Sequence, residues 1–173
     1  TISQKVSKKS EGAFDLSIGP LSKLWRRAFR QNQFPVKAEI EVARAKVNYR
    51  FIQHFPLSKK IRLTEAGMRL DAGGIAKGFA VDECFKILRK VGISSALVAA
   101  GGDIRVGAAP PGKAAWIIAS KGLNEKGETV DVELSLVHEA VSTSGDTYRF
   151  LDWEGQRYSH IVDPRTGLGI QHR

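Results

Sequence analysis

The stretch Leu70–Asp82, LDAGGIAKGFAVD, combines residues that can hold an anion with the start of a helical pattern. Gly73 and Gly74 directly precede that pattern, so we expect them at a helix N-terminus, where unpaired N–H groups and the helix dipole attract negative charge. Lys77 follows one turn later and would add a full positive charge. The same residues also fit a glycine-rich start to a core helix with Lys77 as a solvated charge. Spacing alone leaves both interpretations open.

His160 lies where a predicted strand meets a turn rich in polar groups. In strand phase Tyr158, His160 and Val162 share one face, while Ser159 points to the other. Residues 163–167, DPRTG, then form a turn with Pro at its second position. An imidazole exchanges its proton near neutral pH and can act as a general base. A structural hydrogen-bonding histidine is the alternative, and the pattern does not decide between them.

Two further polar groups could take part in a site. Asp15 comes shortly before Pro20, where it could cap the following helix or contact a ligand. Ser142, Thr143 and Ser144 could line a loop that hydrogen-bonds phosphate or the edge of a ring, or they could form an ordinary Ser/Thr turn.

Composition narrows the class of partner. The 173 residues are 42% hydrophobic and carry a formal net charge of +9, which favours anionic partners such as nucleotides, nucleic acid or an acidic membrane surface. The positive charges are spread over ordinary amphipathic segments and no RNA- or DNA-binding motif is present, so we expect no nucleic-acid partner. No apolar run reaches transmembrane length, and no signal peptide is recognisable.

The central helix must position Lys77, and we expect it to bury one stripe of residues spaced by three or four. The members of this stripe are Ala76, Ala80, Cys84, Leu88 and Val91. Gly92 then suits a left-handed C-cap. Cys84 lies on this apolar stripe, so we expect it in the core. It is also the single cysteine, and we predict neither a disulfide nor a thiolate metal site.

The remaining elements predict an α+β fold with a mainly antiparallel or mixed sheet, in a single domain over residues 1–173. One expected helix begins at Pro20 and carries the apolar stripe Leu21, Leu24, Trp25 and Ala28. A second expected helix spans Ala38–Val47. Expected strands are Tyr49–Phe55, Lys59–Leu63, Ser95–Ala100, Ile104–Val106, Ala115–Ala119 and Thr129–Leu136, followed by a hairpin of Tyr148–Leu151 and Arg157–Val162.

Four motifs stand in a fixed order along the chain. They are EGAFDLSIGPL (11–21), LDAGGIAKGFAVD (70–82), AAGGDI (99–104) and STSGDTYRF…YSHIVDPRTG (142–167). Together they resemble the FAD:protein FMN transferases, the ApbE-type flavin transferases once described as thiamine-biosynthesis lipoproteins. The resemblance implies a T-fold-like α+β architecture. It also implies a magnesium-dependent transferase that moves FMN from FAD to a Ser or Thr hydroxyl of a target protein and releases AMP.

The resemblance also implies roles for individual residues. Ala13, Phe14, Asp15, Asp71, Lys77 and Val162 match FAD-contacting positions. Gly74 falls where the family offers a main-chain oxygen to magnesium, and His160 matches the proposed general base. Asp71 would then face the flavin or adenine, or help to hold the shell of the metal. Two residues depart from the usual pattern, Leu16 for Pro and Ala99 for Asn.

Family members also carry segments that this chain does not show. Secretion and lipid-attachment signals usually precede the first motif, and an Asp and a Thr that bind magnesium follow the last, whereas this chain ends at Arg173. The resemblance therefore implies membrane attachment through a lipid anchor, on the periplasmic side of the bacterial inner membrane. The implied partner is a flavoprotein subunit with a Ser/Thr acceptor motif. An FAD pyrophosphatase giving FMN and AMP, and a non-catalytic flavin-binding protein, are the alternative functions.

Overall fold

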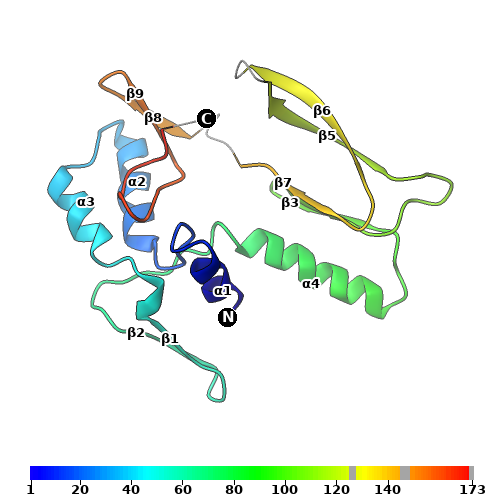
Figure 1. Ribbon diagram of the computed structural model, residues 1–173, viewed down its shortest axis with the longest axis horizontal. Helices are drawn as coiled ribbons and strands as arrows, with labels where there is room; N and C mark the ends of the chain where they lie inside the picture. The colour runs from blue at the N-terminus through cyan, green and yellow to red at the C-terminus, as the bar shows by residue number, and fades with distance from the viewer. Residues whose placement is uncertain (125–127, 145–148, 172–173) are drawn as a thin grey trace. The chain divides into compact units, whose positions relative to one another are not determined.

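The computed structural model describes residues 1–124, 128–144 and 149–171, which form two compact units (Figure 1). Unit 1 contains residues 1–72 together with the C-terminal segment, and unit 2 contains the residues between them, from 73 onwards. Helices occur together with sheets whose strands all pair antiparallel, so the predicted α+β class with a mainly antiparallel sheet is confirmed. The single domain expected over residues 1–173 stays a prediction.

Unit 1 begins with three helices, α1 (Ile2–Lys9), α2 (Gly19–Gln31) and α3 (Lys37–Arg44). Pro20 lies in the first turn of α2, where its missing N–H would have no helical partner. The predicted stripe of α2 is confirmed, because Leu21, Leu24, Trp25 and Ala28 are all buried. None of the helices in the described part of the chain is long and apolar enough to cross a membrane.

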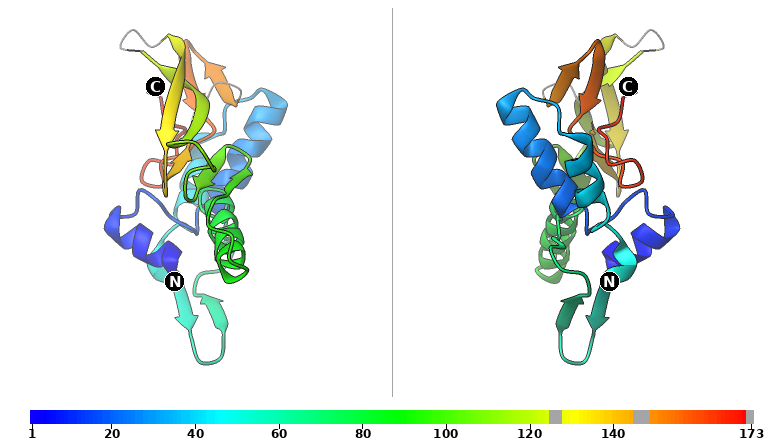
Figure 2. Two further views of the ribbon diagram at one scale, coloured as in Figure 1. Left: turned by 90° about the vertical axis from the view of Figure 1, so that its right-hand side faces the viewer. Right: turned by 90° about the vertical axis from the view of Figure 1, so that its left-hand side faces the viewer.

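The first hairpin of unit 1 is β1 (Ile52–Phe55) with β2 (Lys60–Leu63), and it projects from the unit in both views of Figure 2. The strand expected over Tyr49–Phe55 is only partly correct, because Tyr49–Phe51 form the 3₁₀ turn η1. The cause is local. The side chain of Asn48 accepts a hydrogen bond from the backbone of Arg50 at 3.0 Å, which caps this turn and delays the strand.

The second hairpin of unit 1 joins β8 (Phe150–Trp153) to β9 (Gln156–Ser159). A hairpin is predicted here, but its loop is shorter than expected. Glu154 and Gly155 alone form the turn, with φ of 50° and 76°, and two positive φ values in a two-residue loop match the right-handed twist of paired strands. The strand β9 ends at Ser159 and does not continue to Val162; beyond it, the N–H of Ile170 donates to Ile161 O at 2.8 Å.

The core of unit 1 is built around Trp25, which is almost completely buried. Its indole N–H donates to the carbonyl oxygen of Gly167 at 2.8 Å, and its ring lies 5.8 Å from that of Tyr158. The other buried members of this core are Leu21, Leu24, Ala28, Ile40, Ala43, Leu151 and Val162. Two helices and the C-terminal hairpin therefore share one core, although they are far apart in sequence.

Unit 2 contains the helix α4 (Ala76–Lys90) and two sheets. The first sheet has the order β3 (Leu97–Ala100), β4 (Asp103–Val106) and β7 (Ala140–Ser142), and the second is the ribbon of β5 (Trp116–Leu123) with β6 (Thr129–Leu136). The bounds predicted for Thr129–Leu136 are confirmed. Figure 1 shows α4 beside the three-stranded sheet, and the contacts of α4 are with β3 and β4.

The predicted buried stripe of α4 is wrong, although the helix itself is confirmed. Val81 and Phe85 are the buried residues, whereas Ala80 and Cys84 are exposed. Both stripes have helical spacing and differ by about 100° around the axis. The larger Val and Phe side chains bury more apolar area against β3 and β4, so they decide which face turns inward.

As predicted, Gly92 follows the C-terminus of α4 in a left-handed conformation, with a φ of +82°. The N–H of Ile93 donates to Leu88 O at 2.9 Å and that of Gly92 donates to Arg89 O at 3.1 Å. These two bonds form a Schellman motif, in which a left-handed residue satisfies the last carbonyl groups of a helix.

Candidate functional site

The first motif and the beginning of the central motif lie side by side in unit 1. The N–H of Asp71 donates to Leu16 O at 2.8 Å, and the N–H of Gly19 donates to Arg69 O at 3.2 Å. A Cβ on Gly19 would lie 2.6 Å from the oxygen of Arg69, so this close approach requires glycine. The backbone thus brings the segments that contain Asp15 and Asp71 together.

Asp15 is buried, and both of its carboxylate oxygens have partners in unit 1. Oδ1 accepts from the N–H of Ser17 at 2.8 Å and from its hydroxyl at 2.7 Å, and Oδ2 accepts from the N–H of Tyr49 at 2.7 Å. The capping role considered for Asp15 is wrong, because Ile18 caps α2 without a side-chain hydrogen bond. Asp15 instead joins two loops, which leaves its FAD contact a prediction.

Asp71 forms an ion pair in the same region. Its Oδ2 accepts from Nη2 of Arg26 at 2.6 Å; the aspartate side chain is 15% exposed and that of Arg26 is 70% exposed. A carboxylate beside a phosphate-bearing ligand would repel it, and the guanidinium offsets that repulsion. Of the other residues expected near FAD, Ala13 is exposed and Phe14 is half-buried.

An open cleft of about 760 Å³ lies beside this segment and has Asp71 in its wall. Five cationic side chains line it, namely Lys23, Arg26, Arg30, Arg69 and Arg149. The first three come from one face of α2, because they are spaced by three and four residues. Among the described lining residues these cations face a single carboxylate, that of Asp71. The cleft therefore presents positive charge to an anionic ligand.

His160 contacts this cleft through Arg149. The backbone N–H of His160 donates to the carbonyl oxygen of Arg149 at 2.9 Å, and its Nδ1 lies 3.2 Å from the same oxygen. Because a carbonyl oxygen can only accept, the proton of a neutral ring belongs on Nδ1. Nε2 is then the acceptor nitrogen, on an exposed side chain. This tautomer is the one a general base needs.

The face predicted for His160 is wrong. Tyr158 and Val162 both pack on the core of unit 1, whereas His160 is exposed. The reason is that β9 ends at Ser159, so the alternation of a strand does not extend to His160. The side chain of Val162 is buried, which means that any contact of this residue with a ligand would involve its main chain.

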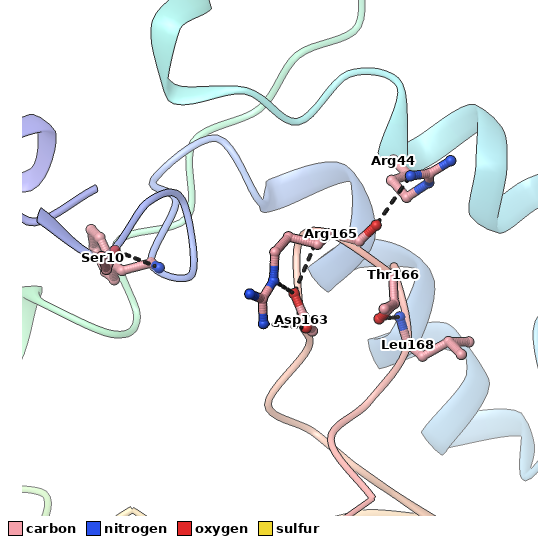
Figure 3. Close-up of polar contacts among 7 residues, drawn as sticks. Ser10, Arg44, Asp163, Arg165, Thr166 and Leu168 are labelled. Carbon is pink, nitrogen blue, oxygen red and sulfur yellow. Dashed lines mark hydrogen bonds and ion pairs between the residues drawn. The ribbon is translucent and has the colours of Figure 1, made fainter. Parts of the chain in front are cut away.

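The DPRTG turn after Val162 is rigidly hydrogen-bonded, as Figure 3 shows. Asp163 accepts from the backbone N–H of Arg165 at 2.9 Å and from its guanidinium at 3.0 and 2.9 Å. These hydrogen bonds hold the pKa of Asp163 below its usual value. Gly167, with a φ of +74°, closes the turn by donating its N–H to Asp163 O at 2.8 Å. The turn therefore fixes the backbone that follows His160.

In unit 2, Lys77 lies in the first turn of α4 and reaches the tight turn between β3 and β4. Its Nζ donates to the carbonyl oxygen of Gly101 at 2.6 Å and lies 3.6 Å from Oδ1 of Asp103. The hydroxyl of Ser142 donates to the same Oδ1 at 2.6 Å. Three of the four motifs thus meet at one cluster, which we call the Lys77 cluster (Lys77, Gly101, Asp103 and Ser142).

Gly73 and Gly74 precede α4 as predicted, and Ile75 is the cap residue without a side-chain hydrogen bond. Negative charge is therefore favoured at this helix end by the dipole and by Lys77. In residues 1–124, 128–144 and 149–171 no three His, Cys, Asp or Glu side chains are placed to hold a metal ion. The contribution of Gly74 to magnesium binding stays a prediction.

Two features of these sites do not follow from the sequence pattern. The cationic cleft draws its cations from three segments, and only the spacing of Lys23, Arg26 and Arg30 is visible in the sequence. The proximity of Asp103, in the AAGGDI motif, to Lys77 depends on how the β3–β4 hairpin packs on α4.

The chain matches one protein family and is similar in sequence to several known proteins. The sequence model of the ApbE family matches residues 1–173. An FAD:protein FMN transferase of Klebsiella pneumoniae is 31% identical over 162 residues, which cover 94% of this chain and 49% of that protein. The enzyme of the same name from Escherichia coli K12 is 27% identical over 99% of this chain and 50% of its own length.

Solved structures agree in fold. The ApbE protein of Thermotoga maritima superposes with a TM-score of 0.82 at 31% identity, covering 96% of this chain and 54% of that one. The flavin transferase ApbE of Vibrio cholerae gives a TM-score of 0.83 at 29% identity, covering 99% and 54%. The chain therefore spans about half the length of the relatives that it matches.

Proposed function

The chain belongs to the ApbE family, and on that premise we propose that it carries catalytic residues of an FAD:protein FMN transferase. The relatives bear this name, and unit 1 offers a cationic cleft suited to a ligand with a pyrophosphate. The observation that carries the proposal is the position of His160, whose Nδ1 lies against Arg149 O beside the cationic cleft.

The proposed reaction is a displacement at phosphorus. A Ser or Thr hydroxyl oxygen of the acceptor protein forms a bond to the phosphorus of the FMN half of FAD. The bond from that phosphorus to the bridging oxygen breaks, and AMP leaves with this oxygen. The hydroxyl proton passes to Nε2 of His160. Phosphoryl transfer depends mainly on positioning and charge neutralisation, which cationic side chains provide, and a base contributes about 10²–10⁴-fold more.

The cationic cleft supports this role for unit 1. FAD carries negative charge on its pyrophosphate, and the cleft combines Arg and Lys side chains with apolar surface from Phe29, Leu70 and Phe150. Such a lining suits a ligand with both charged and aromatic parts. Asp71 in the wall, neutralised by Arg26, can accept hydrogen bonds from a flavin or adenine ring without opposing the phosphates.

Magnesium belongs to the same proposal, on the resemblance of the four motifs. Gly74 would offer a main-chain oxygen, and the ion would neutralise charge on the pyrophosphate. Periplasmic location, a lipid anchor, and an acceptor subunit with a Ser/Thr motif are likewise proposed from the resemblance.

A hydrolase is the second candidate, favoured by one observation. The side chain of His160 is exposed, so water could reach Nε2 in place of an acceptor hydroxyl. The product would then be free FMN with AMP.

One experiment separates these functions. The natural full-length protein is incubated with FAD, magnesium and a flavoprotein acceptor, and the products are identified by mass spectrometry. Covalent FMN on the acceptor together with AMP supports the transferase. Free FMN and AMP support the hydrolase. Bound FAD that remains unchanged over many hours contradicts both and leaves a flavin-binding protein.

A further inference from the structure

Asp103 contacts two other members of the Lys77 cluster, Ser142 and Lys77. Its Oδ1 accepts from the hydroxyl of Ser142 at 2.6 Å and lies 3.6 Å from Nζ of Lys77. The Asp103 side chain is only 18% exposed, whereas that of Lys77 is 46% exposed. The hydroxyl of Ser142 therefore holds a largely covered carboxylate in a fixed place beside a more accessible ammonium.

The hydrogen-bond donors of Lys77 show what this arrangement leaves available. An ammonium group has three N–H donors on a long, flexible side chain. One donor goes to Gly101 O at 2.6 Å, and Asp103 attracts the same ammonium from 3.6 Å. Because two groups orient the ammonium within unit 2, its remaining donor capacity has a defined direction before any ligand binds.

We propose that Asp103 is a positioning residue that holds the ammonium of Lys77 at the β3–β4 turn for contact with a phosphate oxygen. This inference rests on the proposed FMN transfer. Asp103 itself would not touch FAD, since a carboxylate near the pyrophosphate is repulsive. Its effect passes through Lys77, with Ser142 fixing the carboxylate in turn.

The proposal predicts opposite effects on binding and on turnover. In Asp103→Asn the negative charge near Lys77 is lost, so FAD should bind as well as in the wild type or more tightly. The ammonium is no longer drawn to one place, so the charge that develops in the transition state is less well matched. Misplacement by about 1 Å can cost up to about 10²-fold in rate, and we expect kcat to fall by at least about tenfold. A general loss of structure would lower the thermal stability as well as the apparent kcat, so thermal unfolding of each variant is measured beside the kinetics.

Kinetics of the natural full-length protein test this split. The variants are Asp103→Asn, Lys77→Met and the double substitution, with Asp131→Asn as the control, because Asp131 pairs with Lys121 on the β5–β6 ribbon of the same unit. We expect a lower kcat at unchanged or lower KM for Asp103→Asn, no further loss when it is added to Lys77→Met, and wild-type values for the control. Independent, multiplying effects of the two substitutions would overturn the proposal.

A second measurement needs no FMN transfer. Lysines of the FAD-free protein are acetylated with a limiting reagent, and peptide mass spectrometry gives the rate at Lys77 relative to Lys86 and Lys121. If Asp103 restrains the ammonium, Asp103→Asn should raise the relative rate at Lys77 several-fold, with thermal unfolding unchanged. An unaltered rate at Lys77 overturns the positioning role. A raised rate in a protein that transfers no FMN upholds the positioning of Lys77 and rejects the proposed function instead.

Discussion

The carbonyl oxygen of Arg149 accepts the backbone N–H of His160 at 2.9 Å and lies 3.2 Å from Nδ1 of the same residue. One backbone oxygen thus orients both the main chain and the ring of the candidate base. The side chain of Arg149 lines the cationic cleft, so the residue that orients the base also contributes to the proposed anion site.

We predict that His160→Ala retains FAD binding but slows FMN transfer by about 10²–10⁴-fold in the full-length protein, because the acceptor hydroxyl loses its proton acceptor. Binding is measured by flavin fluorescence and transfer by covalent FMN on the acceptor. His54→Ala is the control, since His54 is exposed on β1. Ser159→Ala is unsuitable as a control, because the buried Ser159 hydroxyl accepts from the N–H of Ile161 at 3.1 Å. Transfer by His160→Ala at the wild-type rate would reject the base.

Arg149→Gln should weaken FAD binding about tenfold, because a charge-assisted contact to phosphate is lost, while the carbonyl oxygen that orients His160 remains. Arg62→Gln on β2 is the matched control, as Arg62 is exposed and outside the cleft. Equal dissociation constants for the two variants in a fluorescence titration would exclude the cleft from the FAD site. A substitution of Lys23 would not serve as a control for Arg149→Gln, because Lys23 also lines the cleft.

The Asp163 carboxylate should stabilise the folded protein in a pH-dependent way. The guanidinium of Arg165 lowers the pKa of Asp163 in the folded state. The stabilisation is therefore present above the unfolded pKa, about 3.9, and is lost as the pH falls through the lower folded value. Chemical denaturation of wild type and Asp163→Asn should differ at pH 7 and converge as the pH falls below the lowered folded pKa. Asp152→Asn should change stability less, because the Asp152 side chain is 61% exposed and 3.3 Å from Arg157, whereas that of Asp163 is 23% exposed and 2.9 Å from Arg165. A difference that persists unchanged at low pH would contradict the ionic origin.

Gly167→Ala should destabilise the fold by about 2–4 kcal/mol, because an alanine there combines a strained positive φ with overpacking. Its Cβ would lie 2.7 Å from Cγ2 of Ile40. Gly155→Ala tests the backbone strain alone, since Gly155 has a φ of +76° and a Cβ there would have no neighbouring heavy atom within 4 Å. Denaturant unfolding should show a smaller loss of unfolding free energy for Gly155→Ala than for Gly167→Ala. Equal losses would mean that the Ile40 side chain moves aside without an energetic cost.

Cys84 should react with a thiol reagent in the native protein, because its side chain is exposed on α4. We expect the native rate to be within several-fold of the rate after denaturation, measured with a chromogenic disulfide reagent. Complete protection until unfolding would show that this face of α4 is covered in solution.

Local patterns in the sequence determined much of the secondary structure. Pro20 and the stripe from Leu21 to Ala28 specified the start and the buried face of α2, and Gly92 specified the end of α4. These features follow from steric limits and hydrogen bonding within a few residues, so the local sequence is enough to predict them. The four motifs were likewise sufficient to predict the ApbE family and the α+β class, both of which are confirmed.

The tertiary structure decided which faces turn inward and which charges meet. In α4, Val81 and Phe85 are buried where the sequence pattern predicts Ala80 and Cys84, because burial depends on which face of the helix packs on β3 and β4. The strand β9 ends at Ser159, beyond which Ile161 bonds to Ile170, and His160 is exposed. The ion pairs of Asp71 with Arg26 and of Asp103 with Lys77 join residues that are far apart in sequence. Their positions depend on packing between elements, and periodicity along the chain carries no information about that packing.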